Sequence, residues 1–262
     1  MSGTIVETGR EQGILQDRVL AYAGAAHPPD LLARYASEAD GIVLAGQSGA
    51  GVARKLRSYG YWGPLILDPE CYLRGPEPDN LFGTHIEDWA LRQLQADVSA
   101  YLSPSEYIRR GDEAALIAAI VGGRRFAKAV RKAAQAQGRE VIEPIFTVLP
   151  LDEGWLTNKW FGRLRRRIGR LRVPLALALG CSYDPLASRT AVENLARLAT
   201  ELPTLALLRS DFAAVGALAH GSPMGAIGIR SSVRHIRFSP GGDFKDRSPR
   251  LPIPGTLRWE KG

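Results

Sequence analysis

The stretch that decides the fold is residues 204–235, TLALLRSDFAAVGALAHGSPMGAIGIRSSVRH. The apolar run 205–208 reads as a buried strand, residues 212–219 have the composition of a short helix, and residues 225–229 read as a second buried strand. Polar residues gather where each apolar run stops. Since the interior of a parallel sheet is filled with apolar side chains, chemistry is reached only at the strand ends, and we expect functional groups there.

The same alternation of strand and helix extends over the whole chain. Eight apolar runs alternate with helical patterns, at 18–26, 41–45, 64–67, 97–102, 140–148, 173–179, 205–208 and 225–229. This order predicts an α/β protein with a (β/α)8 TIM-type barrel over residues 18–236. An open doubly wound sheet is the alternative, and the length of 262 residues favours the barrel. Residues 1–17 are then an N-terminal lead-in, and residues 237–262 an irregular tail.

Two connections depart from the simple repeat. Residues 112–137 are alanine-rich and helical in pattern, but Gly122 and Gly123 interrupt them, which predicts two short helices. No amphipathic pattern follows His235, so we expect the eighth covering helix to be missing. The lead-in, the tail or a second subunit would then cover the eighth strand, and the last of these motivates a hypothesis of homo-oligomer formation.

The composition indicates a folded chain without membrane segments. Apolar residues make up 45% of the sequence and charged residues 23%, which suffices for a full core. The apolar runs are too short to cross a bilayer, and residues 1–10 lack the pattern of a secretion signal, so we expect a cytoplasmic protein with no membrane partner. Cys71 and Cys181 lack a CxxC spacing, so the sequence predicts no metal site, and the cofactor, if any, stays unknown at this point.

A cluster of cations and hydroxyls follows the last two strands. The formal net charge of +7 favours anionic partners. Loops seven and eight lie side by side in a barrel, where phosphate is often held, so their side chains would form an anion-binding set suited to a phosphorylated ligand. These side chains are Arg209, Ser210, Arg230, Ser231, Ser232 and Arg234. In the alternative interpretation, these arginines pair with carboxylates of the chain itself, such as Asp68, Asp184 and Asp211.

Carboxylates and histidines at the strand ends are the catalytic candidates. Asp68 directly follows an apolar strand and is the first choice, and Asp211 is the second. Other acids beyond strand ends are Glu70, Asp152, Glu153 and Asp184. Facing carboxylates can have their pKa values pushed apart, which gives one acid and one base. His27 and His235 follow strands one and eight, which become neighbours when a barrel closes, and both could act as acid or base near neutral pH.

The helical pattern at residues 158–172 is strongly basic and contains no acidic residue. Such a concentration of like charge repels itself, which is explained if the surface binds RNA or DNA. A face that pairs with acids elsewhere in the assembly is the alternative. The cations predicted to bind nucleic acid are Lys159, Arg163, Arg165, Arg166, Arg167 and Arg170.

Two short motifs resemble those of the tRNA-guanine transglycosylase superfamily, barrels that exchange a base on a nucleic acid. The segment 216–221, GALAHG, is similar to that family's GGLAVG loop, and Asp68 after the third strand is similar to the start of its DSGGFQ motif. The resemblance implies base exchange with Asp68 in the active site. This chain has Pro69 and Glu70 after the aspartate, and it lacks the family's CxCxxC zinc motif.

Three functional hypotheses follow. The first is a barrel that binds a phosphate-bearing ligand such as nucleic acid, with base or glycosyl transfer as the first candidate reaction. The second is a lyase or isomerase acting on a small phosphorylated metabolite, which needs the loop arginines but not the basic helix. The third is a non-catalytic barrel that binds nucleic acid.

Overall fold

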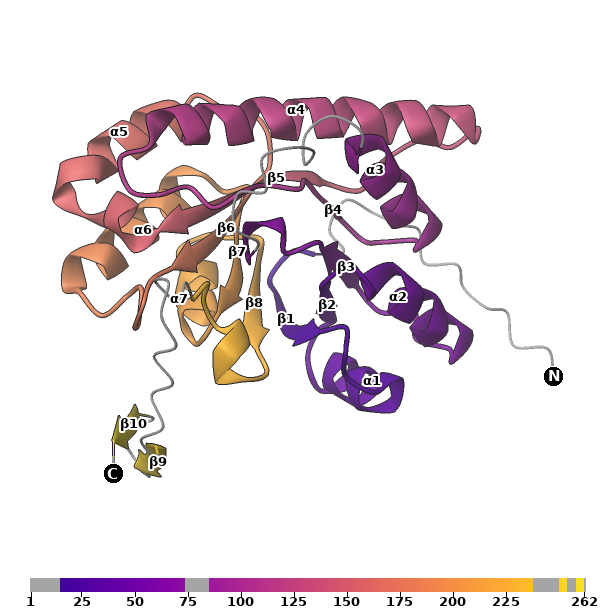
Figure 1. Ribbon diagram of the computed structural model, residues 1–262, viewed down its shortest axis with the longest axis horizontal. Coiled ribbons are helices and arrows are strands. Elements are labelled where there is room, and N and C mark those ends of the chain that lie inside the picture. Colours follow the sequence, from indigo (N-terminus) through magenta and orange to yellow (C-terminus); the bar gives the residue numbers. More distant parts are fainter. Residues whose placement is uncertain (1–14, 74–84, 238–249, 254–257, 262) are drawn as a thin grey trace.

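Eight parallel strands form a nearly closed barrel, which confirms the predicted fold (Figure 1). The computed structural model describes residues 15–73, 85–237, 250–253 and 258–261. The strands are β1 (Arg18–Gly24), β2 (Ile42–Ala45), β3 (Leu65–Asp68), β4 (Tyr101–Leu102), β5 (Ile145–Asp152), β6 (Leu175–Gly180), β7 (Leu205–Ser210) and β8 (Met224–Gly228). They pair in the order β3-β2-β1-β8-β7-β6-β5-β4. A parallel bridge between Ile66 and Ala100 links β3 to the residues just before β4.

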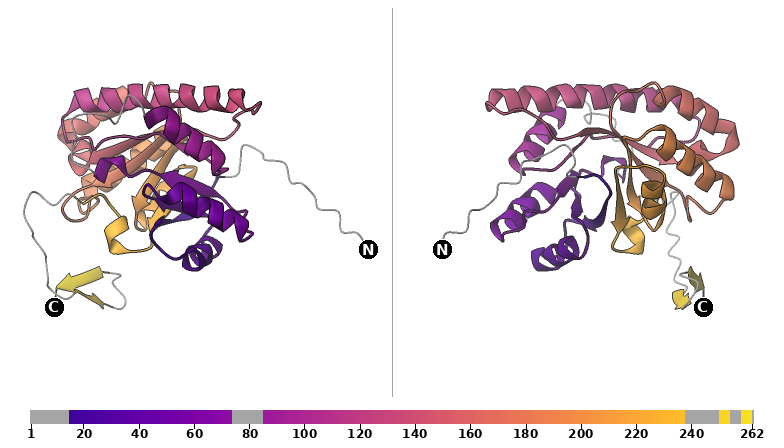
Figure 2. Two further views of the ribbon diagram at one scale, coloured as in Figure 1. Left: turned by 45° about the vertical axis from the view of Figure 1, so that its right-hand side comes forward. Right: turned by 180° about the vertical axis from the view of Figure 1, so that it is seen from behind.

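Helices alternate with the strands and surround the barrel (Figure 2). They are α1 (Pro29–Glu38), α2 (Gly49–Ser58), α3 (His85–Gln95), α4 (Glu113–Ala136), α5 (Asn158–Ile168), α6 (Arg189–Glu201) and α7 (Ala213–Ala219). Every second strand residue points outward and packs against these helices, for example Leu175 and Leu177 of β6. The strands read as continuous apolar runs because the other residues fill the barrel interior.

The interior of the barrel combines large and small side chains. Leu20 of β1 and Phe146 of β5 fill it together with alanines of β6, β7 and β8. Leu15 also belongs to this interior cluster and is buried. The last residues before β1 thus also contribute to the core.

Helix α4 is one continuous helix, so the prediction of two short helices in this region is wrong. Asp112 caps it, since its carboxylate accepts a hydrogen bond from the Ala115 amide at 2.9 Å. Gly123 lies where the helix crosses β5, and a Cβ there would stand 2.2 Å from Oγ1 of Thr147. Glycine is therefore required for close packing at this point, and it does not end the helix.

Within the described residues, no α-helix follows β8, as predicted. Helix α7 covers both β7 and β8, because Gly225 of β8 has no side chain and lets Ala214 approach. After the short 3-10 turn η3 (Ser231–Val233), the chain turns over the mouth of the barrel. Ile236 then pairs with Gly180 of β6 and is fully buried in the interior cluster.

The C-terminal region is not wholly irregular, contrary to the prediction. Strands β9 (Arg250–Ile253) and β10 (Arg258–Lys261) pair antiparallel, with Arg258 opposite Ile253 (Figure 1). Among the helices of the described residues, none is long and apolar enough to cross a bilayer.

The packing at Gly123 gives a test of the fold. Replacing Gly123 with alanine should lower the free energy of unfolding by about 1–3 kcal/mol, because the added methyl group overlaps Thr147. Gly162→Ala is the matched control, since Gly162 is a helical glycine with open space around its Cβ position. It should raise the free energy of unfolding by about 0.4–1 kcal/mol. Urea denaturation of both variants measures this, and equal effects would contradict the packing.

Candidate active site at the barrel mouth

Asp68 is the centre of a hydrogen-bonded cluster at the mouth of the barrel. Asp68 is 1% exposed, and one carboxylate oxygen, Oδ2, accepts hydrogen bonds from the hydroxyls of Tyr22 and Tyr72 at 2.8 and 2.7 Å. The other oxygen, Oδ1, accepts the Glu70 amide at 2.9 Å. Burial, followed by the charge of Asp68, raises the pKa of both tyrosines well above the ordinary value, so they remain protonated donors.

Glu70 lies beside Asp68 and is the more accessible of the two carboxylates. Its backbone has a positive φ of 52°, which turns the chain back over the mouth after β3. The side chain is 18% exposed. Burial and the neighbouring Asp68 raise the pKa of Glu70, although an ion pair with Arg209 opposes this rise. Asp68 and Glu70 thus form a carboxylate pair in different surroundings.

Arg209 reaches this cluster because β7 contains an irregularity. Between Leu207 and Ser210 the pairing with β8 shifts, and Arg209 has a φ of 51°. Simple alternation would place Arg209 on the outer face with Leu207, but the shifted strand directs its side chain into the mouth. There the guanidinium stacks over the rings of Tyr22 and Tyr72, with its Cζ 5.6 and 5.9 Å from their centroids.

The role predicted for Arg209 as an open anion clamp needs correction. Its guanidinium forms an ion pair with Glu70 and donates to the carbonyls of His235 at 3.1 Å and Ser232 at 2.9 Å. It is 4% exposed. Arg209 is therefore bound to a carboxylate of the chain itself, and an external anion would have to displace Glu70.

The rest of the predicted anion-binding set lies at the rim. Ser210 is buried, and its hydroxyl donates to the carbonyl of Ala226 at 3.2 Å. Arg234 donates to the carbonyl of Gly228 at 3.3 Å. Arg230, Ser231 and Ser232 are exposed on the loop after β8. These three residues, together with the half-buried Arg234, remain accessible to a ligand.

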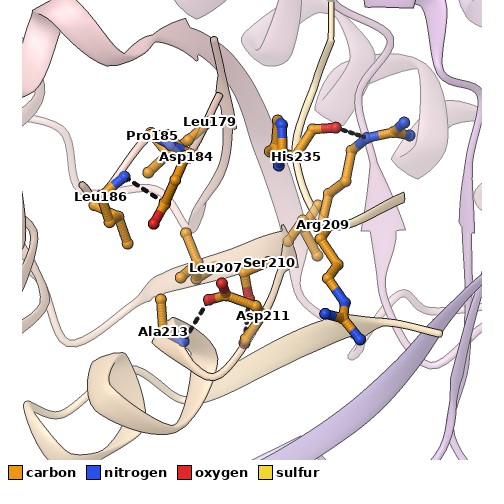
Figure 3. A pocket seen from close by; sticks show the side chains of 12 residues that line it. Leu179, Asp184, Pro185, Leu186, Leu207, Arg209, Ser210, Asp211, Ala213 and His235 are labelled. Carbon is orange, nitrogen blue, oxygen red and sulfur yellow. Dashed lines mark hydrogen bonds between the residues drawn. The ribbon is translucent and has the colours of Figure 1, made fainter. Parts of the chain in front are cut away.

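A small pocket opens beside the central cluster, between the ends of β6 and β7 (Figure 3). Asp184 and Asp211 line it from opposite loops, and His235 closes one side. Each aspartate also caps its own loop, since Asp184 accepts the Leu186 amide at 2.9 Å and Asp211 accepts the Ala213 amide at 3.0 Å. Asp211 thus lines this pocket, and among the described residues no hydrogen bond joins it to Asp68.

His235 is a buried, neutral histidine. Burial, and then the charge of Arg237, lowers its pKa to about 4. Its Nε2 accepts a hydrogen bond from Nε of Arg237 at 3.1 Å. Among the described residues, no hydrogen bond joins His235 to His27.

Part of the positive charge that the sequence of helix α5 indicates is neutralised by ion pairs with neighbouring helices. Arg163 and Arg167 both bind Glu113 of α4, at 2.8 and 3.0 Å, and Arg165 binds Glu201 of α6 at 2.5 Å. Lys159 and Arg163 both stack on the ring of Trp160.

Two cations of the predicted nucleic-acid surface remain without such partners. Arg166 and Arg170 are exposed, and neither forms an ion pair within residues 15–73 and 85–237.

Sequence reasoning missed Tyr22 and Tyr72, which complete the cluster. Tyr22 is an aromatic residue with a polar hydroxyl in an otherwise apolar strand. Its side chain points to the barrel interior, as does that of Leu20 two residues earlier. Tyr72 continues the spacing of Asp68 and Glu70 by two residues at a time. These were the available signals, but the turn that folds Tyr72 back over Asp68 cannot be read from spacing alone.

Metal and thiol chemistry receive no support from the described side chains. Within that part of the chain, no three histidine, cysteine, aspartate or glutamate side chains gather in a way that could hold a metal ion. Burial, and then the neighbouring Glu153, raises the pKa of Cys181 to about 12, so this residue stays a thiol near neutral pH.

No model of a known protein family matches the chain, and no curated protein is detectably similar to it in sequence. The resemblance to the transglycosylase superfamily therefore rests on two short motifs. The structure has Asp68 at the end of β3, and it has the first residues of the segment 216–221 at the end of helix α7.

The lowered pKa of His235 predicts a pH dependence of stability. The unfolded chain binds a proton to this imidazole below about pH 6.5, whereas the folded chain does so only below about pH 4. The free energy of unfolding should therefore fall as the pH falls from 6.5 toward 4. In His235→Gln this part of the dependence should disappear, while the exposed His220→Gln control keeps it. Urea denaturation at a series of pH values measures both, and a dependence that persists in His235→Gln would contradict the assignment.

Proposed function

We propose that this barrel is an enzyme that binds a phosphate-bearing ligand, a nucleic acid, at its mouth and performs base or glycosyl transfer there. The observation that carries the proposal is the pair of carboxylates at the end of β3. Asp68 is fixed by three hydrogen bonds, whereas the neighbouring Glu70 is partly accessible and has a raised pKa.

Two carboxylates in different surroundings suit the cleavage of a glycosidic bond. One group must donate a proton to the leaving base, and a negative charge must face the sugar carbon as positive charge develops on it. Glu70, the more accessible of the two carboxylates, is assigned the role of proton donor, and it must leave its ion pair with Arg209 to carry the proton. Asp68 is the fixed carboxylate behind it. As the bond to the base breaks, the bonding electrons leave with the base, which takes the proton of Glu70. The sugar carbon then forms a bond to a ring nitrogen of the incoming free base, and that nitrogen returns its proton to Glu70.

The rim provides groups that would hold a phosphate. Arg230, Ser231 and Ser232 are exposed on the loop after β8, and Arg234 lies beside them. Guanidinium forks and hydroxyl groups match the oxygens of a phosphodiester. The Ser232 carbonyl accepts a hydrogen bond from Arg209, so this loop is anchored to the same cluster that contains Glu70.

The catalytic assignment is tested by isosteric changes of the two carboxylates. Glu70→Gln should slow incorporation of radiolabelled guanine into bulk transfer RNA by roughly 10²–10⁴-fold, because the proton donor is lost. Asp68→Asn should have a comparable effect, while nucleic-acid binding in a filter assay stays unchanged in both. Glu193→Gln, on the exposed face of α6, is the control. Full activity of both mouth variants would contradict the catalytic assignment. A wild type that binds nucleic acid but incorporates no base, with binding unchanged in Asp68→Asn and Asp211→Asn, would instead support a non-catalytic barrel.

A second candidate is a lyase or isomerase acting on a small phosphorylated metabolite. The pocket lined by Asp184, Asp211, Arg234 and His235 favours it, because carboxylates, a cation and a neutral imidazole line one small space. This reaction would need no macromolecular contact on α5.

Reversal of exposed charge on α5 separates the two candidates. Arg166→Glu with Arg170→Glu should weaken activity on a nucleic acid, because the phosphate backbone loses two cationic contacts. These positions are preferable to Arg165 and Arg167, which already bind Glu201 and Glu113. Activity of the double variant is compared with that of wild type at several salt concentrations. Unchanged activity at every salt concentration would favour the small-metabolite candidate.

A further inference from the structure

The outer face of helix α4 is a basic surface that sequence reasoning did not identify. Between Glu113 and Glu140 the chain contains no acidic residue. The exposed cations of this helix are Arg124, Arg125, Lys128, Arg131 and Lys132, hereafter the α4 cations.

The α4 cations lie on one side of the helix. At about 100° per residue, all five fall within an arc of about 120°. Phe126 and Val130 lie between these cations in the sequence, but they are buried on the opposite side of the helix against the outer core. The basic residues are thus displayed together on the surface, along about 12 Å of helix from position 124 to position 132.

Nothing in the described part of the chain neutralises this face. Within residues 15–73 and 85–237, none of the α4 cations forms an ion pair. Lys128 lies four residues from both Arg124 and Lys132, a spacing at which like charges repel. On α5, by contrast, Glu113 and Glu201 neutralise three of the arginines.

We propose that the α4 cations bind the sugar-phosphate backbone of a nucleic acid. Charge complementarity supports this occupant, since a row of closely spaced cations matches a polyanion with regularly spaced phosphates. An acidic membrane surface fits less well, because the aliphatic side chains on this arc, Ile117 and Val121, are only 42% and 39% exposed and no aromatic residue accompanies them. The inference shares its partner with the proposed function, but it does not require the barrel mouth to be catalytic.

Salt-dependent binding tests the surface. Fluorescently labelled single-stranded RNA, duplex RNA and duplex DNA of mixed sequence are titrated with full-length protein across a salt series. Arg124→Gln with Lys128→Gln should weaken binding and reduce the slope of log K against log salt by about 1.4–1.8, which corresponds to two lost contacts. Arg54→Gln with Lys55→Gln on α2 is the matched control, because it removes the same charge from another exposed helix and should leave the slope unchanged.

A footprint on the unaltered protein provides a second measurement. Acetylation by a lysine-specific reagent, read by mass spectrometry, should be slowed at Lys128 and Lys132 when RNA or DNA is bound, and not at Lys55. This readout does not depend on the folding of any variant. Equal protection of all three lysines would overturn the proposal.

The outcomes separate this inference from the proposed function. If wild type binds nucleic acid and the α4 and α2 variants behave alike, the α4 assignment is wrong and the proposed function stands. If wild type binds none of the three nucleic acids but binds phosphatidylserine vesicles, the inference fails together with the nucleic-acid partner. If the α4 variant loses binding while Glu70→Gln retains activity, the inference stands and the catalytic assignment fails.

Discussion

The ion pair between Arg209 and Glu70 is the interaction on which the mouth of the barrel depends. A guanidinium that is almost fully buried needs a negative charge and hydrogen-bond acceptors nearby, because an unpaired buried charge is strongly destabilising. Glu70 provides one acceptor from the loop after β3, and the carbonyls of Ser232 and His235 provide the others from the segment after β8. One side chain of β7 therefore links segments from both ends of the chain. The hydroxyls of Tyr22 and Tyr72 extend the same network to Asp68.

The packing around the barrel explains how this network is held. Gly123 and Gly225 let helices α4 and α7 lie close to their strands, so that each helix presses directly against the sheet. Ile236 then fills the interior beneath the mouth and fixes the segment that contains His235. The irregularity of β7 at Arg209 is the one place where the strand departs from alternation, and it directs the only arginine of that strand into the cluster.

Three of the basic residues that stand out in the sequence have acidic partners in the fold. Residues of α5 look like an isolated cationic run, yet Glu113, fifty residues before Arg163, neutralises two of them. Helix α4 looks like an ordinary alanine-rich segment, yet its cations gather on one exposed face. The functional weight of a basic residue therefore depends on which acids the fold brings next to it. Here the fold neutralises three arginines of α5, whereas within the described residues the α4 cations form no ion pair.

Local pattern alone determined the barrel, since eight apolar runs alternating with helical segments can bury their surfaces in few other ways. It also determined that Asp68 ends a strand at the mouth. Only the tertiary structure decided which polar groups meet: the pairing of Arg209 with Glu70, and the contact of Tyr22 and Tyr72 with Asp68. The physical reason is that hydrophobic periodicity is a local property of the chain, whereas a hydrogen bond or ion pair across a barrel depends on turns, a strand irregularity and the approach of residues far apart in sequence.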